Sequence, residues 1–251
     1  MPASLSQCAV AHPGDHAIRP LFVVIVGHAR ISGHAADPPT EGLALMRDEK
    51  ISEFLNRLAD RVPAPGGGAS AALHVAQAAA LLGMVARYTT GDRYAQHAAS
   101  IAEVIALTDE LRSVALRLAQ DDADAFTAVT ESYKLPKDTE EAVAERSATI
   151  AAALVGAAKP PAEVIVVAAA CVELAEKLLP IGNPNVVTDI AAAAEAARAA
   201  ATTARVNIEI NLAGIKDEGA RAELTSQAGR VDDIALRAEQ VTAAVRKEIA
   251  R

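Results

Sequence analysis

Long alanine-rich segments with apolar residues at helical spacing are the feature that most limits how this chain can fold. Alanine has the highest intrinsic helix propensity, and its small side chain lets neighbouring helices approach closely. Only 2% of the 251 residues are aromatic and Trp is absent, so the core has to be built from small and aliphatic side chains. The sequence therefore predicts an all-α protein.

Short clusters of Pro, Gly and Asn divide these segments into about seven helices. The expected helices cover approximately residues 48–60, 70–89, 94–132, 139–158, 162–179, 186–213 and 217–251, with Asp48 and Thr139 as N-caps and a break at 159–161. Several long helices joined by short turns are typical of an up-and-down bundle. Alanine-rich helices often leave apolar stripes for a partner subunit, so we expect a homodimer that forms through helix faces.

Charge, hydropathy and cysteine content exclude several classes of protein. The net charge of −8 and the pI near 5.3 provide no basic surface for nucleic acid or an anionic membrane. No run approaches the roughly 18 consecutive apolar residues that a membrane span needs. The two cysteines, Cys8 and Cys171, fit a reducing compartment. We therefore expect a cytoplasmic protein without nucleic-acid or membrane partners.

Residues 1–46 differ in composition from the rest of the chain. They contain four of the six histidines (His12, His16, His28 and His34), whose spacing matches no metal-ligand pattern. We interpret residues 1–46 as a disordered extension or the product of a mis-assigned start codon. Residues 47–251 are then a single helical domain.

One carboxylate stands out in the expected helix 94–132. At about 100° per residue, Asp122 falls on the apolar face with Leu118 and Phe126, whereas Asp121 and Asp124 lie on the polar face. Desolvation raises a carboxyl pKa, which would make Asp122 usable as a proton shuttle near neutral pH. An inward Asp can also cap a neighbouring helix or pair with a buried Arg, and the pattern leaves both readings open.

Two further breaks carry polar groups that a plain bundle does not need. Gly66, Gly67 and Gly68 follow Pro65 at a helix start, where free N–H groups can form either a cradle for a polar ligand or a tight turn. Asparagine is unfavourable inside helices, yet Asn207 and Asn211 lie one turn apart. Such amides can cap helices or bind a heteroaromatic ligand.

Taken in order, these motifs resemble the cyclodeaminase/cyclohydrolase family, which includes the C-terminal domain of formiminotransferase-cyclodeaminase and stand-alone methenyltetrahydrofolate cyclohydrolases. The resemblance covers about residues 48–250. Its motifs are Phe54-Leu55, Ala64-Pro65-Gly66-Gly67-Gly68, Asp122-Ala123-Asp124-Ala125-Phe126, Leu135-Pro136-Lys137 with Thr139-Glu140-Glu141, Gly182-Asn183, Thr188-Asp189 and Asn207-Ile208-Glu209-Ile210-Asn211-Leu212. Thr188 stands where the family usually has serine, Asp124 replaces a common glutamate, and Lys159-Pro160-Pro161 is an unusual proline break.

The resemblance implies a helical dimer that binds a tetrahydrofolate derivative between helices, without a metal or a permanently bound cofactor. It implies that Asp122 is the catalytic residue. The implied substrate-binding residues are Pro65, Gly66, Gly67, Gly68, Lys137, Asn183, Asp189, Asn207 and Asn211. Among these, Lys137 is expected to meet the anionic glutamate tail of the folate, which can be polyglutamylated.

The family carries two reactions, and the residues suit both. A cyclohydrolase adds water to 5,10-methenyltetrahydrofolate to give 10-formyltetrahydrofolate, and a cyclodeaminase releases ammonia from formiminotetrahydrofolate to give the methenyl compound. Each reaction needs a carboxylate that moves protons and favours a cation. The given chain contains no formiminotransferase segment, so we expect the cyclohydrolase, with the cyclodeaminase as alternative. A non-catalytic, folate-binding helical dimer is the third hypothesis.

Overall fold

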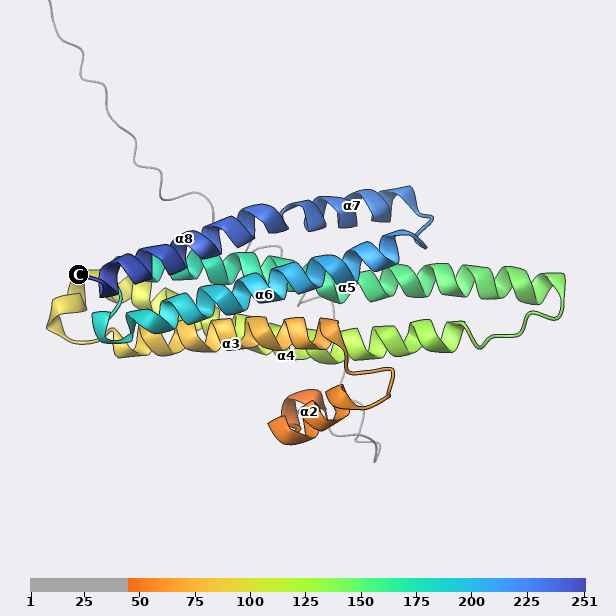
Figure 1. The fold of residues 1–251 in the computed structure, drawn as a ribbon, viewed down its shortest axis with the longest axis horizontal. Coiled ribbons are helices and arrows are strands. Elements are labelled where there is room, and N and C mark those ends of the chain that lie inside the picture. The colour runs from red at the N-terminus through yellow and green to blue at the C-terminus, as the bar shows by residue number, and fades with distance from the viewer. Residues whose placement is uncertain (1–44) are drawn as a thin grey trace, which may run out of the picture. The chain divides into compact units, whose positions relative to one another are not determined.

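The computed structural model describes residues 45–251. Its regular elements are seven α-helices and three 3-10 helices (Figure 1). The α-helices are α2 (Ile51–Ala59), α3 (Gly67–Tyr88), α4 (Ala98–Ser132), α5 (Glu140–Leu178), α6 (Val187–Leu212), α7 (Glu218–Gly229) and α8 (Val231–Ile249), and the 3-10 helices are η1 (Met46–Asp48), η2 (Asp92–His97) and η3 (Pro184–Val186). The predicted all-α fold is confirmed.

Helices α3, α4, α5 and α6 pack side by side, and α8 covers α6 (Figure 1). From α3 to α6, consecutive helices run in opposite directions (Figure 1). In the α3–α4 pair, for example, Gly83 lies beside Thr108, whereas Gly68 at the start of α3 lies beside Asp122 in the second half of α4. The described residues thus form the up-and-down bundle that the short turns predict.

Small side chains make this close packing possible. On α6, six alanines at helical spacing are completely buried: Ala193, Ala194, Ala197, Ala200, Ala201 and Ala204. The largest completely buried side chains are Leu, Ile and Val, among them Leu82 and Ile190. Because alanine adds little bulk, neighbouring backbones approach closely enough to bring the N-terminus of one helix to the side of another.

The predicted break at residues 159–161 is wrong, because α5 continues through Pro160 and Pro161. Each proline removes one backbone hydrogen bond from the helix, at a cost of about 3 kcal/mol in an isolated helix. Both prolines are buried, and so are Ala157, Ala158 and Val164 around them. Burial of this apolar face against the other helices outweighs the local preference of proline.

The predicted elements also differ at both ends of the described region. The last predicted helix divides into α7 and α8 at Arg230, directly after Gly229. Helix α2 begins after Lys50, so Asp48 is not its N-cap but part of η1. Met46 is buried, and its backbone N–H donates to Gln120 Oε1 of α4 at 3.1 Å. The folded part therefore includes Met46, while the interpretation of residues 1–44 lies outside the described region.

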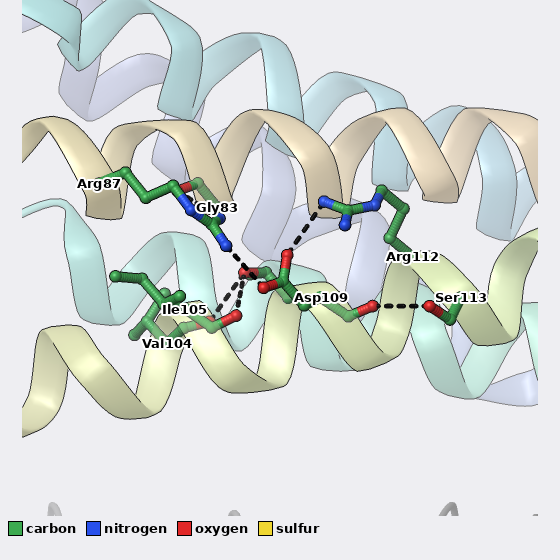
Figure 2. Close-up of polar contacts among 8 residues, drawn as sticks. Gly83, Arg87, Val104, Ile105, Asp109, Arg112 and Ser113 are labelled. Carbon is green, nitrogen blue, oxygen red and sulfur yellow. Dashed lines mark hydrogen bonds and ion pairs between the residues drawn. The ribbon is translucent and has the colours of Figure 1, made fainter.

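A charged cluster joins the exposed edges of α3 and α4 (Figure 2). Arg87 donates from Nη2 to Asp109 Oδ2 at 2.6 Å and from Nη1 to the carbonyl of Gly83 at 3.2 Å. Arg112 approaches the other carboxylate oxygen, Oδ1, to 3.0 Å. The hydrogen bond and positive charge of Arg87, with those of Arg112, hold the pKa of Asp109 below its ordinary value despite some desolvation.

Among the described residues, α3 and α5 are long and apolar enough to cross a membrane by length and composition alone. Neither helix contains an uninterrupted run of about 18 apolar residues, because its hydropathy is an average over many alanines and a few polar residues. In α3, 61% of the most apolar window is buried inside the bundle, and in α5 33% is. Helices at the core of a helical bundle share this composition.

Candidate active site

The carboxylate of Asp122 lies directly over the N-terminus of α3. A Cβ atom added at Gly68 would lie 1.9 Å from Asp122 Oδ1 and 2.4 Å from its Cγ, so any side chain at this position would displace the carboxylate. The backbone N–H of Ala69 donates a hydrogen bond to the carboxylate. It is one of the N–H groups at a helix start that have no partner within the helix. Within this motif it is Gly68 that lets a carboxylate from α4 approach the backbone of α3.

Burial controls the protonation of Asp122. Desolvation raises the pKa of this carboxyl from 3.8 to about 6, although the hydrogen bond from Ala69 lowers it in part. No Arg or Lys contributes to this balance. The predicted alternative in which Asp122 pairs with a buried Arg is therefore not what the structure contains. A carboxyl with this pKa can accept and return a proton near neutral pH.

Asn207 of α6 lies on the other side of the glycine motif. Its Nδ2 atom is 3.7 Å from the position that a Cβ on Gly67 would take, and Thr203 is also within contact distance. Asn207 Nδ2 donates to the carbonyl of Thr203 at 2.9 Å, and Asn211 Nδ2 donates to the carbonyl of Asn207 at 2.8 Å. Each amide thus uses one of its two N–H donors within α6, which leaves its Oδ1 atom as an acceptor and its second N–H as a donor.

The residues that meet here come from three helices: Asp122 from α4, Gly67 and Gly68 from α3, and Asn207 from α6. Pro65 and Gly66 lead into the same turn. The Ala64–Pro65 peptide bond is cis, and the Gly66 carbonyl accepts from Ser70 Oγ at 3.0 Å. The side chains offer the carboxylate and the amide oxygens as acceptors, together with one free N–H on each amide. This arrangement suits a ligand that is cationic or rich in N–H donors.

Two of the predicted binding residues lie at the opposite end of α3. Asn183 donates from Nδ2 to the carbonyl of Tyr88 at 2.8 Å, and its backbone N–H donates to Thr89 Oγ1 at 3.0 Å. It therefore caps the C-terminus of α3, a helix of 22 residues and about 33 Å. Asp189 lies in the first turn of α6, near the same end. Within one chain, neither residue lies beside Asp122.

Lys137 is also separate from this group. It is exposed in the turn between α4 and α5, which follows the end of α4 at Ser132. Ten residues of helix separate Asp122 from Ser132, or about 15 Å. Lys137 therefore lies beyond the N-terminal end of α3.

Phe126 is not part of the buried stripe that the helical pattern predicted. It is 45% exposed, whereas Leu118 on the same face is 3% exposed. The reason is that α4 extends past the start of α3, so α3 does not cover Phe126, whereas Val129 further along α4 is buried. Asp121 and Asp124 are exposed, as predicted.

The sequence did not single out the Ala69 N–H, Thr203 or His74. The first could have been anticipated from the free N–H groups of any helix start. His74 lies on α3, two turns from Gly67, and its Nδ1 atom is buried without a hydrogen-bond partner. Within residues 45–251, no group of three or more His, Cys, Asp and Glu side chains is arranged to hold a metal ion.

Comparison with known proteins places the chain among folate enzymes. Residues 50–230 match the family model described as formiminotransferase-cyclodeaminase. The methenyltetrahydrofolate cyclohydrolase of Methylorubrum extorquens is 37% identical over 171 residues, which are 68% of this chain and 82% of that protein. The formimidoyltransferase-cyclodeaminase of Sus scrofa is 30% identical over 69% of this chain, which spans only 32% of that longer protein.

A solved structure has the same fold. The formiminotetrahydrofolate cyclodeaminase of Thermotoga maritima superimposes with a TM-score of 0.69 at 30% identity, over 79% of this chain and 98% of that protein. The family match covers most of the chain and includes the Asp122 and Gly66–Gly68 motifs. The chain therefore belongs to the formiminotransferase-cyclodeaminase family of one-carbon folate enzymes.

Proposed function

We propose that the protein hydrolyses 5,10-methenyltetrahydrofolate to 10-formyltetrahydrofolate, with Asp122 as the proton shuttle. The observation that carries this proposal is the half-buried carboxylate, which has a pKa of about 6 and is held against Gly68 at the start of α3, where the neighbouring Gly67 faces Asn207. The substrate carries a cationic amidinium, and the acceptors at this site favour a cation. The greater similarity to the Methylorubrum cyclohydrolase supports hydrolysis over deamination.

The chemistry needs one group that both takes and returns a proton. A water molecule adds to the methenyl carbon, and its proton passes to the Asp122 carboxylate, which gives a neutral carbinolamine. The carboxylic acid then protonates N5 as the bond from carbon to N5 breaks, and the carbinol hydroxyl loses its proton to form the formyl group on N10. One proton is released overall.

Cyclodeamination is the second candidate function, favoured by the fold of the Thermotoga protein. In that reaction N10 attacks the formimino carbon, ammonia leaves, and the methenyl bridge closes. Asp122 would carry the proton from N10 to the departing nitrogen. A binding protein without activity is the third candidate, although it gives no reason to hold a carboxylate at a raised pKa.

We further propose that the protein is a cytoplasmic homodimer that needs no permanently bound cofactor. Exposed apolar side chains on α4 and α6 support the dimer, because Phe126, Val206 and Ile210 all lie within about one helical turn of Asp122 or Asn207. A second copy that covered them would also shield the site from water.

The test follows the absorbance of the methenyl chromophore with the purified full chain. Loss of the signal from methenyltetrahydrofolate supports the cyclohydrolase, and a gain from formiminotetrahydrofolate supports the cyclodeaminase. If neither absorbance change occurs and the protein still binds folate saturably, only the hypothesis of a binding protein remains.

Asp122→Asn identifies the catalytic group. We expect this variant to lose about 10²–10⁴-fold in kcat, the usual contribution of a general acid–base, while it remains folded. Asp124→Asn is the matched control, because Asp124 is an exposed carboxylate two residues away on the polar face. Near-normal activity of Asp122→Asn would refute the assignment.

A further inference from the structure

His74 lies on the same face of α3 as Gly67, about 120° around the helix from Gly68. Seven residues, close to two full turns, separate it from Gly67, whose side faces Asn207 and Thr203 of α6. It is six residues, or about 9 Å along the helix, from Gly68, which contacts Asp122. His74 is thus displaced along α3 from the catalytic carboxylate, toward the C-terminus of that helix.

One nitrogen of the imidazole is buried. Nδ1 is buried and has no hydrogen-bond partner among the described residues, while the residue as a whole is half-buried. Nε2 is therefore the nitrogen left to meet a ligand, and it can donate a hydrogen bond when it carries the ring proton.

No side chain of α6 is placed to accept a hydrogen bond from His74 Nε2. Since α3 and α6 run in opposite directions, the part of α6 opposite His74 is the segment 193–200, which is alanine except for Glu195 and Arg198. These two residues pair with each other at 2.6 Å, and Glu195 also accepts from Thr242 of α8. The donor is left for a group outside this part of the fold.

The polar groups of the site therefore differ between its two ends along α3. Toward the N-terminus of α3 lie the amides of Asn207 and Asn211, which offer both acceptors and N–H donors, and toward its C-terminus lies His74, which can donate from Nε2. A tetrahydrofolate has the matching direction. Its pterin end is rich in N–H donors, the one-carbon bridge follows, and a p-aminobenzoyl group separates that bridge from the carboxylates of the glutamate.

We infer that the folate lies along α3 with its pterin toward Asn211, and that His74 donates from Nε2 to the glutamate carboxylate. This inference rests on the proposed function. In this inference His74 contributes to specificity for the glutamate tail of the folate and does not transfer protons. It also differs from the expected role of Lys137, since Lys137 lies beyond the start of α3, on the pterin side of Asp122.

The experiment compares two substrates that differ only in the tail. One is 5,10-methenyltetrahydrofolate, and the other is 5,10-methenyltetrahydropteroate, which has no glutamate. His74→Ala is the test variant, because alanine suits the packing of α3 and removes the unpaired nitrogen. Gln77→Ala, one turn further along the same helix and exposed, is the matched control, and Lys137→Ala tests the competing tail contact.

We expect His74→Ala to raise KM for the folate roughly tenfold or more, the loss that follows removal of a hydrogen bond to a charged group. Its kcat, and its KM for the pteroate, should stay at the wild-type values, as should both parameters of Gln77→Ala. An equal KM increase for both substrates, or no increase, would overturn the inference. So would a glutamate-dependent loss in Lys137→Ala alone. Wild-type protein without activity on either substrate would instead refute the proposed function.

Discussion

At the scale of single residues, the burial of Asp122 lowers the stability of the folded protein and at the same time provides a group that can shuttle protons. The folded state raises the pKa of this carboxyl from 3.8 to about 6, so ionisation destabilises the fold. The cost is absent below pH 3.8, grows as the pH rises toward 6, and is complete above it.

Asp122→Asn should therefore be more stable than the wild type at pH 7, by about 1–3 kcal/mol after allowance for partial solvent screening. The asparagine keeps an oxygen that can accept from Ala69, but it cannot ionise. At pH 4 the two proteins should unfold at the same temperature. Thermal unfolding at both pH values measures this, and an Asn variant less stable at pH 7 would contradict the assigned burial.

Gly68 is the second residue that the site depends on. In Gly68→Ala the new Cβ would overlap Asp122 Oδ1 at 1.9 Å, so the carboxylate has to swing away from its position over α3. Misplacement of a catalytic group by about 1 Å can cost roughly 10²-fold in rate. We expect that loss in kcat, measured by the methenyl absorbance, with little change in folding because only a flexible side chain end moves.

Gly66→Ala is the control for this substitution, because a Cβ at Gly66 meets no atom within 4 Å. It should keep most of the activity. If both alanine variants lost activity equally, flexibility of the turn, and not the approach of Asp122, would explain the glycines.

At the scale of helices, the sequence predicted most elements and the inward position of Asp122, because helical periodicity and alanine content are local properties. It failed at Pro160 and Pro161, where burial against other helices decides the structure. It also grouped Asn183 and Asp189 with the catalytic residue, although they lie at the other end of α3. Order along a chain does not reveal which ends of antiparallel helices meet.

The Arg87–Asp109–Arg112 cluster joins two such helices, and Asp109→Asn should loosen it. All three side chains are at least 39% exposed, so we expect a loss of only about 0.5–1 kcal/mol at pH 7. Because the pKa of Asp109 is lowered, its contribution is present above its ordinary value of 3.8 and disappears as the pH falls below that value.

Urea unfolding at pH 7 measures this loss, and high salt should reduce it by screening. The matched control is Asp138→Asn, which removes the same charge from an exposed turn. Equal destabilisation by both variants would show that net charge, and not the cluster, is responsible.

At the scale of the whole molecule, exposed apolar side chains lie on both helices that supply polar side chains to the site. Ile210 is 76% exposed and Val206 is 60% exposed on α6, and Phe126 of α4 is 45% exposed. Each large apolar side chain that becomes buried contributes about 1.5–3 kcal/mol. A second copy that covers the exposed face of α6 would gain that energy beside Asn207.

Ile210→Glu tests whether this face is the dimer interface, because a dimer would have to bury the unpaired carboxylate. We expect sedimentation velocity to show a dimer for the wild type and a monomer for this variant. Leu236→Glu is the control, since Leu236 is 54% exposed on α8, and it should remain dimeric. If Ile210→Glu sedimented as the wild type does, α6 would not be the interface, and the site would have to be closed from water by this chain alone.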